Sequence, residues 1–229
     1  MGFFYYDSTI WLMFVAIAIS IWAQIKVTST YSKYSRTASE NNLPAHVVAK
    51  EILGYNGLSD VRVEQVQGRL TDHYDPRTKV LRLSQGVYNS PSVAALGIAA
   101  HEVGHAIQHK EGYTPLKIRS ALVPVTQFSS SASWILIILG LVLGSFSLAQ
   151  IGIILFMVII VFQLVTLPVE FNASSRALAA LEGGGYLPRE EVAQTKKVLD
   201  AAALTYVAAV VVSLLQLLRL ILIFGGNRD

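Results

Sequence analysis

The feature that most constrains the fold of this chain is a run of fifty residues, 120–169, that contains no charged side chain. About 20 apolar residues are enough to cross the hydrocarbon core of a bilayer, which is roughly 30 Å thick. Fifty residues are too many for one span and fit two, with the break near Gly144-Ser145-Phe146-Ser147. The alternative, a set of buried core helices in a soluble protein, does not account for an uncharged run of this length. The sequence therefore predicts two adjacent membrane spans.

Two further segments have the length and apolar character of membrane spans. Ser8–Val27 carries one charge, Lys26, near its end. Ala201–Phe224 carries Arg219 near its far end, where the long side chain can reach the bilayer surface. Only 14% of the 229 residues are charged, against about 25% in ordinary soluble domains. We therefore expect an integral membrane protein with four transmembrane helices.

The first span could instead be a cleaved signal peptide. A signal peptide begins with a positively charged segment and ends at a cleavage site of small residues. Met1–Asp7 has no positive charge, and no clear cleavage site follows the span. The basic residues Lys26, Lys33 and Arg36 come after it. We therefore expect a retained anchor whose N-terminus lies outside the cell.

The distribution of basic residues predicts the orientation. Twelve of the 18 Lys and Arg residues lie between Lys26 and Arg119, and four lie between Arg176 and Lys197. Only Arg219 and Arg228 remain. Four spans put the two basic segments on one side of the membrane, and the positive-inside rule makes that side cytoplasmic. We expect a multi-pass protein of the plasma (inner) membrane.

Charge and cysteine content exclude several classes of site. The net charge of +3 reflects this topology and contact with the lipid bilayer, and no aromatic-basic pattern typical of nucleic-acid binding accompanies it. We expect no nucleic-acid partner. The chain has no cysteine, which excludes disulfides and thiolate metal sites and fits a reducing compartment.

The polar segment after the first span contains recognisable elements. Patterning predicts a helix from Pro44 to about Leu53 that stops at Gly54, a strand at 61–66, a hairpin of 68–74 and 79–83 around a turn at 75–78, and a helix opened by Ser90-Pro91 and closed by Gly112. The small sheet could offer an edge strand to an extended peptide, or it could simply cover the helix that follows it. The sequence favours neither use.

His101-Glu102-Val103-Gly104-His105 is the pattern that carries chemistry. Two histidines four residues apart on a helix point to the same side, so both imidazoles can reach one metal ion. The glutamate between them can take a proton from a metal-bound water. A pair of core histidines is the alternative, but the small residues around them leave space for a ligand.

A catalytic zinc needs a third protein ligand. His109 continues the same helix face, but ligands on three successive turns would spread over roughly 12 Å of rise, too far for one ion. Glu170 is the better candidate because it is the first charge after the fifty-residue run, where a carboxylate is costly unless it is paired or metal-bound. A helix over 169–182 would place Glu170, Ala173, Ser174 and Ala177 on one stripe of mostly small residues. The alternative for Glu170 is a charge that marks the end of a span.

Three stretches together resemble the bacterial YugP-type neutral zinc metallopeptidases, which are membrane gluzincins distantly similar to HtpX and CAAX-type peptidases. These stretches are L-T-D-H-Y-D-P-R at 70–77, H-E-V-G-H-A-I-Q-H at 101–109 and P-V-E-F-N-A-S at 168–174. The resemblance covers most of the chain from about Pro44 to Ala209. It implies one Zn²⁺ per chain, with His101, His105 and Glu170 as ligands and Glu102 as the base.

The chain departs from HtpX-like enzymes behind the ligands. Those enzymes have an aspartate four residues after the ligand glutamate, where it orients a histidine, and this chain has Ser174. Asn172 or Ser174 is expected to take that role, and His109 is expected to support the site or the helix. Candidates for stabilising the oxyanion are His73, Tyr74, Arg176 and Tyr206. For each of these four, the alternative is an ordinary interfacial polar residue.

We interpret the chain as a zinc-dependent endopeptidase that hydrolyses membrane or misfolded proteins on the cytoplasmic side of the bilayer. Its partners would be the bilayer and a peptide or protein substrate, and a homo-oligomer or a membrane-protein partner stays open. The first alternative is a zinc-binding chaperone or assembly scaffold without hydrolysis. Retention of Glu102 argues against it, because a structural zinc site needs no base. The second is a protease that cuts within the bilayer, but the motif helix is too polar for that.

The predicted fold class is a mainly α-helical membrane protein with four transmembrane helices. A cytoplasmic zincin-like α+β domain with a small β-hairpin or sheet completes it. The expected segments are an N-terminal anchor (1–27), a cytoplasmic domain with the motif helix (28–119), two transmembrane helices (120–169), cytoplasmic helices with the third ligand (170–200) and a C-terminal transmembrane helix (201–229).

Overall fold

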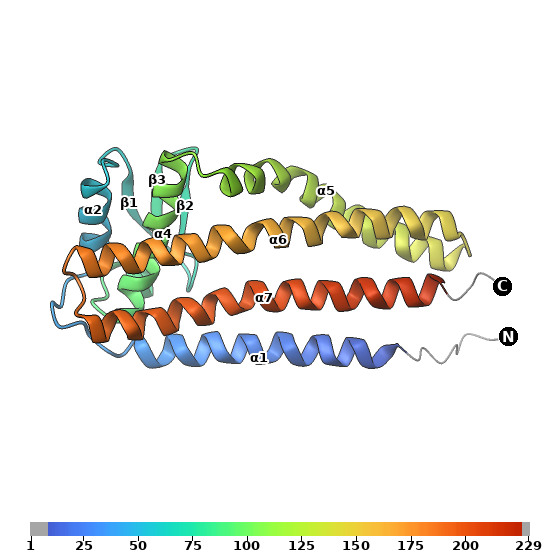
Figure 1. The fold of residues 1–229 in the computed structure, drawn as a ribbon, viewed down its shortest axis with the longest axis horizontal. Helices are drawn as coiled ribbons and strands as arrows, with labels where there is room; N and C mark the ends of the chain where they lie inside the picture. The colour runs from blue at the N-terminus through green and yellow to red at the C-terminus, as the bar shows by residue number, and fades with distance from the viewer. Residues whose placement is uncertain (1–8, 226–229) are drawn as a thin grey trace. The chain divides into compact units, whose positions relative to one another are not determined.

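The computed structural model describes residues 9–225, so the predictions made for Met1–Asp7 and Arg228 lie outside the described residues. The described chain forms seven helices and three strands (Figure 1). In chain order they are α1 (Ile10–Tyr34), α2 (Ala45–Tyr55), β1 (Arg62–Val66), β2 (His73–Asp75), β3 (Val80–Ser84), α3 (Gln85–Tyr88), α4 (Val93–Lys110), α5 (Thr114–Val142), α6 (Phe146–Gly183) and α7 (Arg189–Gly225).

The chain divides into two compact units. The first contains the N-terminal segment up to Gln24, Ile118–Leu167 and the C-terminal segment from Thr205. The second contains Ile25–Lys117 and Pro168–Leu204. Within the described residues, α1, α5, α6 and α7 are long and apolar enough to cross a membrane, and these four candidate spans agree in number with the prediction.

The first unit consists of apolar helix segments that keep large hydrophobic side chains on their surface. Phe128 is 69% exposed and Leu141 is 65% exposed. Such a surface is unfavourable in water and suits a lipid environment. Gly140 approaches the backbone of Ala149 so closely that an added Cβ would lie 2.6 Å from the Ala149 nitrogen. The chain reverses between α5 and α6 at Gly144, which has a φ of +63°, as the break in the uncharged run predicts.

The second unit contains a three-stranded mixed sheet in the order β1-β3-β2. β2 pairs antiparallel with β3, which confirms the predicted hairpin, and β1 pairs parallel with β3. The prediction of a strand over 68–74 is too long, because the strand covers only His73–Asp75. Gly68 and Leu70 have φ values of 106° and 55°, which a strand cannot contain.

Helix α4 is the centre of the second unit. Most of its side chains are buried, and α2 packs against it. The hydroxyl of Ser92, not Ser90, caps the helix by accepting from the backbone nitrogen of Ala95 at 3.2 Å, which corrects the predicted start. The predicted end at Gly112 is confirmed by its φ of +66°. Helix α2 runs through Gly54, so the predicted stop there is also wrong.

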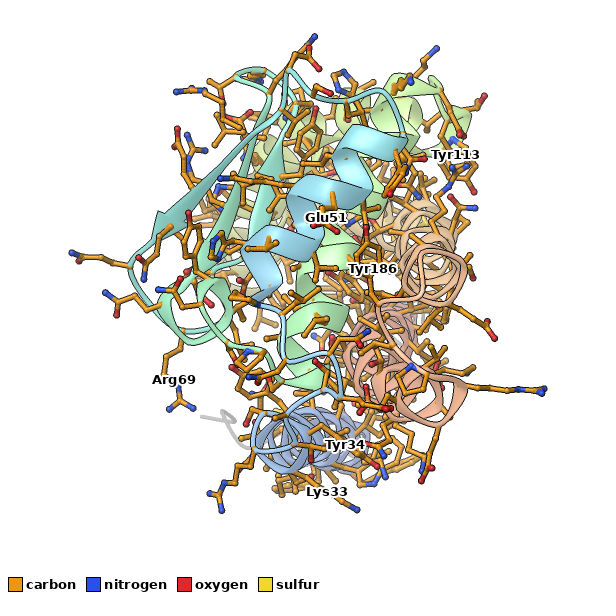
Figure 2. The ribbon with its side chains drawn as sticks, turned by 90° about the vertical axis from the view of Figure 1, so that its left-hand side faces the viewer. Lys33, Tyr34, Glu51, Arg69, Tyr113 and Tyr186 are labelled. Atoms are coloured by element: carbon orange, nitrogen blue, oxygen red, sulfur yellow. The ribbon has the colours of Figure 1, made fainter. Side chains whose placement is uncertain are left out.

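The connection between α6 and α7 is attached to the same unit through Tyr186. The ring is buried in the core, and its hydroxyl bonds to Glu51 on α2; Figure 2 shows the two side chains next to each other. Burial, and then the bond to Glu51, raise the pKa of Tyr186 to about 12. The amide of Asn41 donates to the carbonyls of Gly185 and Tyr186 at 3.0 Å. These contacts hold the C-terminal end of α6 in place.

Candidate metal centre

Helix α4 brings the two motif histidines together. Their rings stack edge to face, with centroids 4.8 Å apart and an interplanar angle of 87°. Both histidines are half-buried, whereas Ala100, Val103 and Ala106 around them are buried. This is the arrangement expected from a spacing of four residues on a buried helix.

Helix α6 supplies the third side chain. Glu170 is 3% exposed, and its Oε2 lies 3.2 Å from Nε2 of His101 and 3.7 Å from Nε2 of His105. One ligand atom from each of the three residues lies within 4.8 Å of the others, so the group could hold a metal ion. Two imidazole nitrogens and one carboxylate oxygen are a donor set typical of catalytic zinc.

Helices α4 and α6 pack closely enough for the three side chains to converge. A Cβ added to Gly104 would lie 2.6 Å from the carbonyl oxygen of Ala173 and 3.1 Å from its Cα. Gly104 lies between the two histidines in sequence, and Ala173 lies between Glu170 and Ser174. The absence of a side chain at Gly104 therefore brings the two helix backbones together where the three side chains converge.

Glu102 is buried and is held by the sheet. Its Oε2 accepts a hydrogen bond of 3.0 Å from the backbone nitrogen of Tyr74 on β2. Because β2 pairs with β3 on one side only, this nitrogen belongs to the unpaired edge of the sheet. The carboxylate of Glu102 is therefore positioned by strand β2 as well as by its own helix.

Each histidine has a hydrogen-bond partner at its other ring nitrogen. Nδ1 of His101 lies 3.1 Å from the hydroxyl of Ser174, where the resemblance placed an orienting residue. Nδ1 of His105 lies 3.0 Å from Oε1 of Gln108. Gln108 was not among the predicted site residues, although its place three residues after His105 on the same helix is a usable signal.

Two of the remaining candidates, Asn172 and Arg176, form contacts between α6 and α4. Asn172 bonds to Gln108 and to Arg176, so it belongs to the environment of the histidines. Arg176 also forms an ion pair of 2.7 Å with Glu111, at the end of α4. Both of these side chains therefore connect α6 to α4.

His109 and His73 form their hydrogen bonds with residues outside the three converging side chains. His109 is exposed and bonds through Nδ1 to the hydroxyl of Tyr74 at 3.0 Å. His73 is exposed and bonds to the carbonyl of Thr71. Tyr206 belongs to the first unit, not to the unit that contains the cluster. An oxyanion-binding role for these residues stays a prediction.

The electrostatics of the cluster favour a cation. Burial lowers the pKa of His105, but the bond to Glu170 and the negative charges of Glu102 and Glu170 outweigh it, so the pKa is raised overall. A positive charge at His105 is thus stabilised by its surroundings. A divalent cation would benefit from the same carboxylates in place of the proton.

Comparisons with known proteins identify the family of the chain. The profile of the family described as "Putative neutral zinc metallopeptidase" matches residues 9–225. A relative from Bacillus subtilis (strain 168), named "Putative membrane protease YugP", is 49% identical over 220 residues, which cover 96% of this chain and 98% of the relative. No solved structure gives a significant match to the chain.

Proposed function

The chain belongs to the family of putative neutral zinc metallopeptidases, and from this membership and the site geometry we propose that it is a membrane zinc endopeptidase. One observation carries the proposal. The side chains of His101, His105 and Glu170 converge within 4.8 Å. A buried glutamate, Glu102, follows His101 directly in the same helix and is fixed by a backbone donor. A purely structural site would not need that glutamate.

We assign one Zn²⁺ to His101, His105 and Glu170. Bound there, the ion would polarise the scissile carbonyl and lower the pKa of a bound water toward ~7. Each histidine would use Nε2 toward the ion, because Nε2 of both rings faces Glu170. The hydrogen bonds at Nδ1 hold the two rings in that orientation.

Glu102 acts as the general base. Since its Oε2 is engaged by the nitrogen of Tyr74, we assign the proton transfer to Oε1. Glu102 takes the proton of the attacking water and later gives it to the leaving amine, a role that typically contributes about 10²–10⁴-fold to the rate. Burial of Glu102 keeps bulk water from competing for its hydrogen bonds.

The unpaired edge of β2 is the proposed place for an extended substrate. In antiparallel pairing, the backbone groups of every second residue point away from the partner strand, and within β2 Tyr74 is such a residue. The N–H of Tyr74 is bonded to Glu102 and is not available to a substrate. We therefore expect this edge to hold the substrate mainly by accepting a hydrogen bond at the carbonyl of Tyr74.

We place the site on the cytoplasmic side, as the distribution of basic residues indicates, and we expect membrane or misfolded proteins as substrates. The name of the Bacillus relative supports a protease of the membrane. The segment boundaries given above, with residues 28–119 and 170–200 in the cytoplasm, are part of this proposal.

Glu102→Gln tests the function directly. The full chain in detergent should bind one zinc in both forms, because the substitution leaves the three ligands in place. Cleavage of a labelled unfolded protein should fall by about 10²-fold or more in the variant. Undiminished cleavage would remove Glu102 from the mechanism. Zinc binding without cleavage by the wild type, together with suppression of aggregation by both forms, would favour a zinc-binding chaperone instead.

A further inference from the structure

A line of hydrogen bonds runs from His105 across to α6. Oε1 of Gln108 lies 3.0 Å from Nδ1 of His105, and Nε2 of Gln108 donates to Oδ1 of Asn172 at 2.9 Å. Nε of Arg176 donates to the same Oδ1 at 2.7 Å. Nε2 of Gln108 also donates to the carbonyl of Val169 at 2.8 Å. The side chain of Gln108 is completely buried.

The direction of each bond follows from the chemistry of the partners. A guanidinium group has donors and no acceptor, so the atom of Asn172 that meets Arg176 must be its carbonyl oxygen. That oxygen can only accept from Gln108, and the carbonyl of Val169 can also only accept. Two independent partners therefore require the NH₂ group of Gln108 to face α6.

The amide of Gln108 must then present its oxygen to His105. An amide oxygen accepts and cannot donate, so Nδ1 of His105 carries the proton. The lone pair of the neutral ring is consequently on Nε2, which lies 3.7 Å from Oε2 of Glu170. This is the tautomer that a metal bound between the two side chains requires.

The hydrogen bond at Nδ1 of His101 does not fix the tautomer of that ring. A serine hydroxyl can donate or accept, so the bond between Ser174 and His101 is compatible with either tautomer. The two histidines are therefore held by different means, one by an adaptable hydroxyl and one by a directed amide.

We propose that Gln108 is the positioning residue that fixes the tautomer and ring orientation of His105, and that Asn172 and Arg176 fix the amide of Gln108. The inference rests on the proposed zinc site and adds to it the origin of the ligand geometry. Arg176 also forms an ion pair with Glu111 at the end of α4, so the side chain of Arg176 is itself fixed. Burial of Gln108 makes an unmatched amide costly, which disfavours the flipped orientation.

Substitutions at Gln108 and Asn172 test whether these hydrogen bonds orient the amide of Gln108 toward His105. Gln108→Met keeps the length and volume and removes the acceptor. Asn172→Asp keeps an oxygen that accepts from both neighbours, whereas Asn172→Leu removes it. Thr195→Val is the matched control, because Thr195 is equally buried and bonds to α4 at the carbonyl of Val93, two turns before His101.

The readouts are the zinc dissociation constant from competition with a chelator and the visible spectrum of the Co²⁺-substituted full chain in detergent. Thermal unfolding of the metal-free protein reports on folding alone. We expect Gln108→Met and Asn172→Leu to weaken zinc binding by about 10- to 100-fold and to change the Co²⁺ spectrum. Asn172→Asp should stay within about threefold of the wild type, and Thr195→Val should bind zinc normally.

Each other outcome has a distinct meaning. Wild-type zinc affinity and an unchanged Co²⁺ spectrum in Gln108→Met would overturn the inference. If that variant does not fold, equal losses of affinity in Asn172→Asp and Asn172→Leu would overturn it instead. A wild type that binds no zinc would refute the proposed function, which makes the two failures distinguishable.

Discussion

Gly104→Ala is the substitution for which the structure gives the clearest quantitative expectation. The new Cβ would lie 2.6 Å from the carbonyl oxygen of Ala173, whereas ordinary contacts begin near 3.4 Å. The obstructing atoms belong to the backbone of α6 and cannot turn away. The two helices would therefore have to separate locally by about 0.4–0.8 Å, because packed interiors have no free space for the methyl group.

This displacement is large for a metal site. Ligand distances in such sites are held to within about 0.2 Å. Glu170 and His101 lie one helical turn or less from the obstruction, so their 3.2 Å separation would widen by a comparable amount. We expect zinc affinity to fall by about tenfold or more, which corresponds to at least roughly 1.4 kcal/mol.

The folding cost is expected to be smaller. Overpacking costs about 1–3 kcal/mol, while alanine in place of a helical glycine returns about 0.5–1 kcal/mol. The metal-free variant should therefore fold with a modestly lower Tm. Zinc affinity and metal-free Tm, measured on the same detergent-solubilised protein, separate the two effects.

Two other glycines in the same unit serve as controls. A Cβ at Gly54 meets nothing within 4 Å, so Gly54→Ala should change neither quantity or raise the Tm slightly. A Cβ at Gly97 would lie 2.5 Å from Cγ2 of Thr195, a side-chain atom, so Gly97→Ala should lower the Tm without affecting zinc. Wild-type zinc affinity in Gly104→Ala would refute the reasoning that close helix approach forms the site.

Three further predictions address the ligands, the pH dependence and the topology. Glu170→Ala should lower zinc occupancy, measured by metal analysis, by roughly tenfold or more, and full occupancy would indicate another ligand. Burial raises the pKa of Asp72 above its ordinary value of 3.8, so stability is lost as the pH rises from the pKa of the unfolded chain toward the higher pKa of the folded protein. Asp72→Asn should therefore gain in Tm relative to the wild type as the pH is raised above about 4, and a relative loss would contradict the assignment. A reporter fused after residue 229 should be accessible outside the cell, whereas a cytoplasmic signal would mean an incorrect span count.

The features that the sequence predicted well depend on local information. An uncharged run indicates a membrane span by its composition alone, and the predicted number of spans agrees with the four long apolar helices. A spacing of four residues fixes the relation of His101 to His105 on any helix. The placement of Glu170 came from the cost of an isolated carboxylate at the end of a span, and the structure brings it to the two histidines.

The features that were missed depend on contacts between distant segments. β1 lies outside the predicted hairpin but pairs in parallel with β3, one of the hairpin strands. No turn sequence predicts this pairing, because parallel strands are not joined by a tight turn. Ser90 and Ser92 are equally good caps by residue type, and the choice between them depends on the path of the preceding chain. The role of Gln108 depends on Val169 and Asn172, more than sixty residues away.

The separation of the clustered side chains along the chain has a consequence for biosynthesis. His101 and Glu170 are 69 positions apart, and all of α5 lies between them. While a ribosome is still making α5, the nascent polypeptide already carries the motif helix but has no third donor to complete the tripod. If the proposed function is correct, hydrolysis would require translation past Glu170, and a product terminated earlier would lack that ligand.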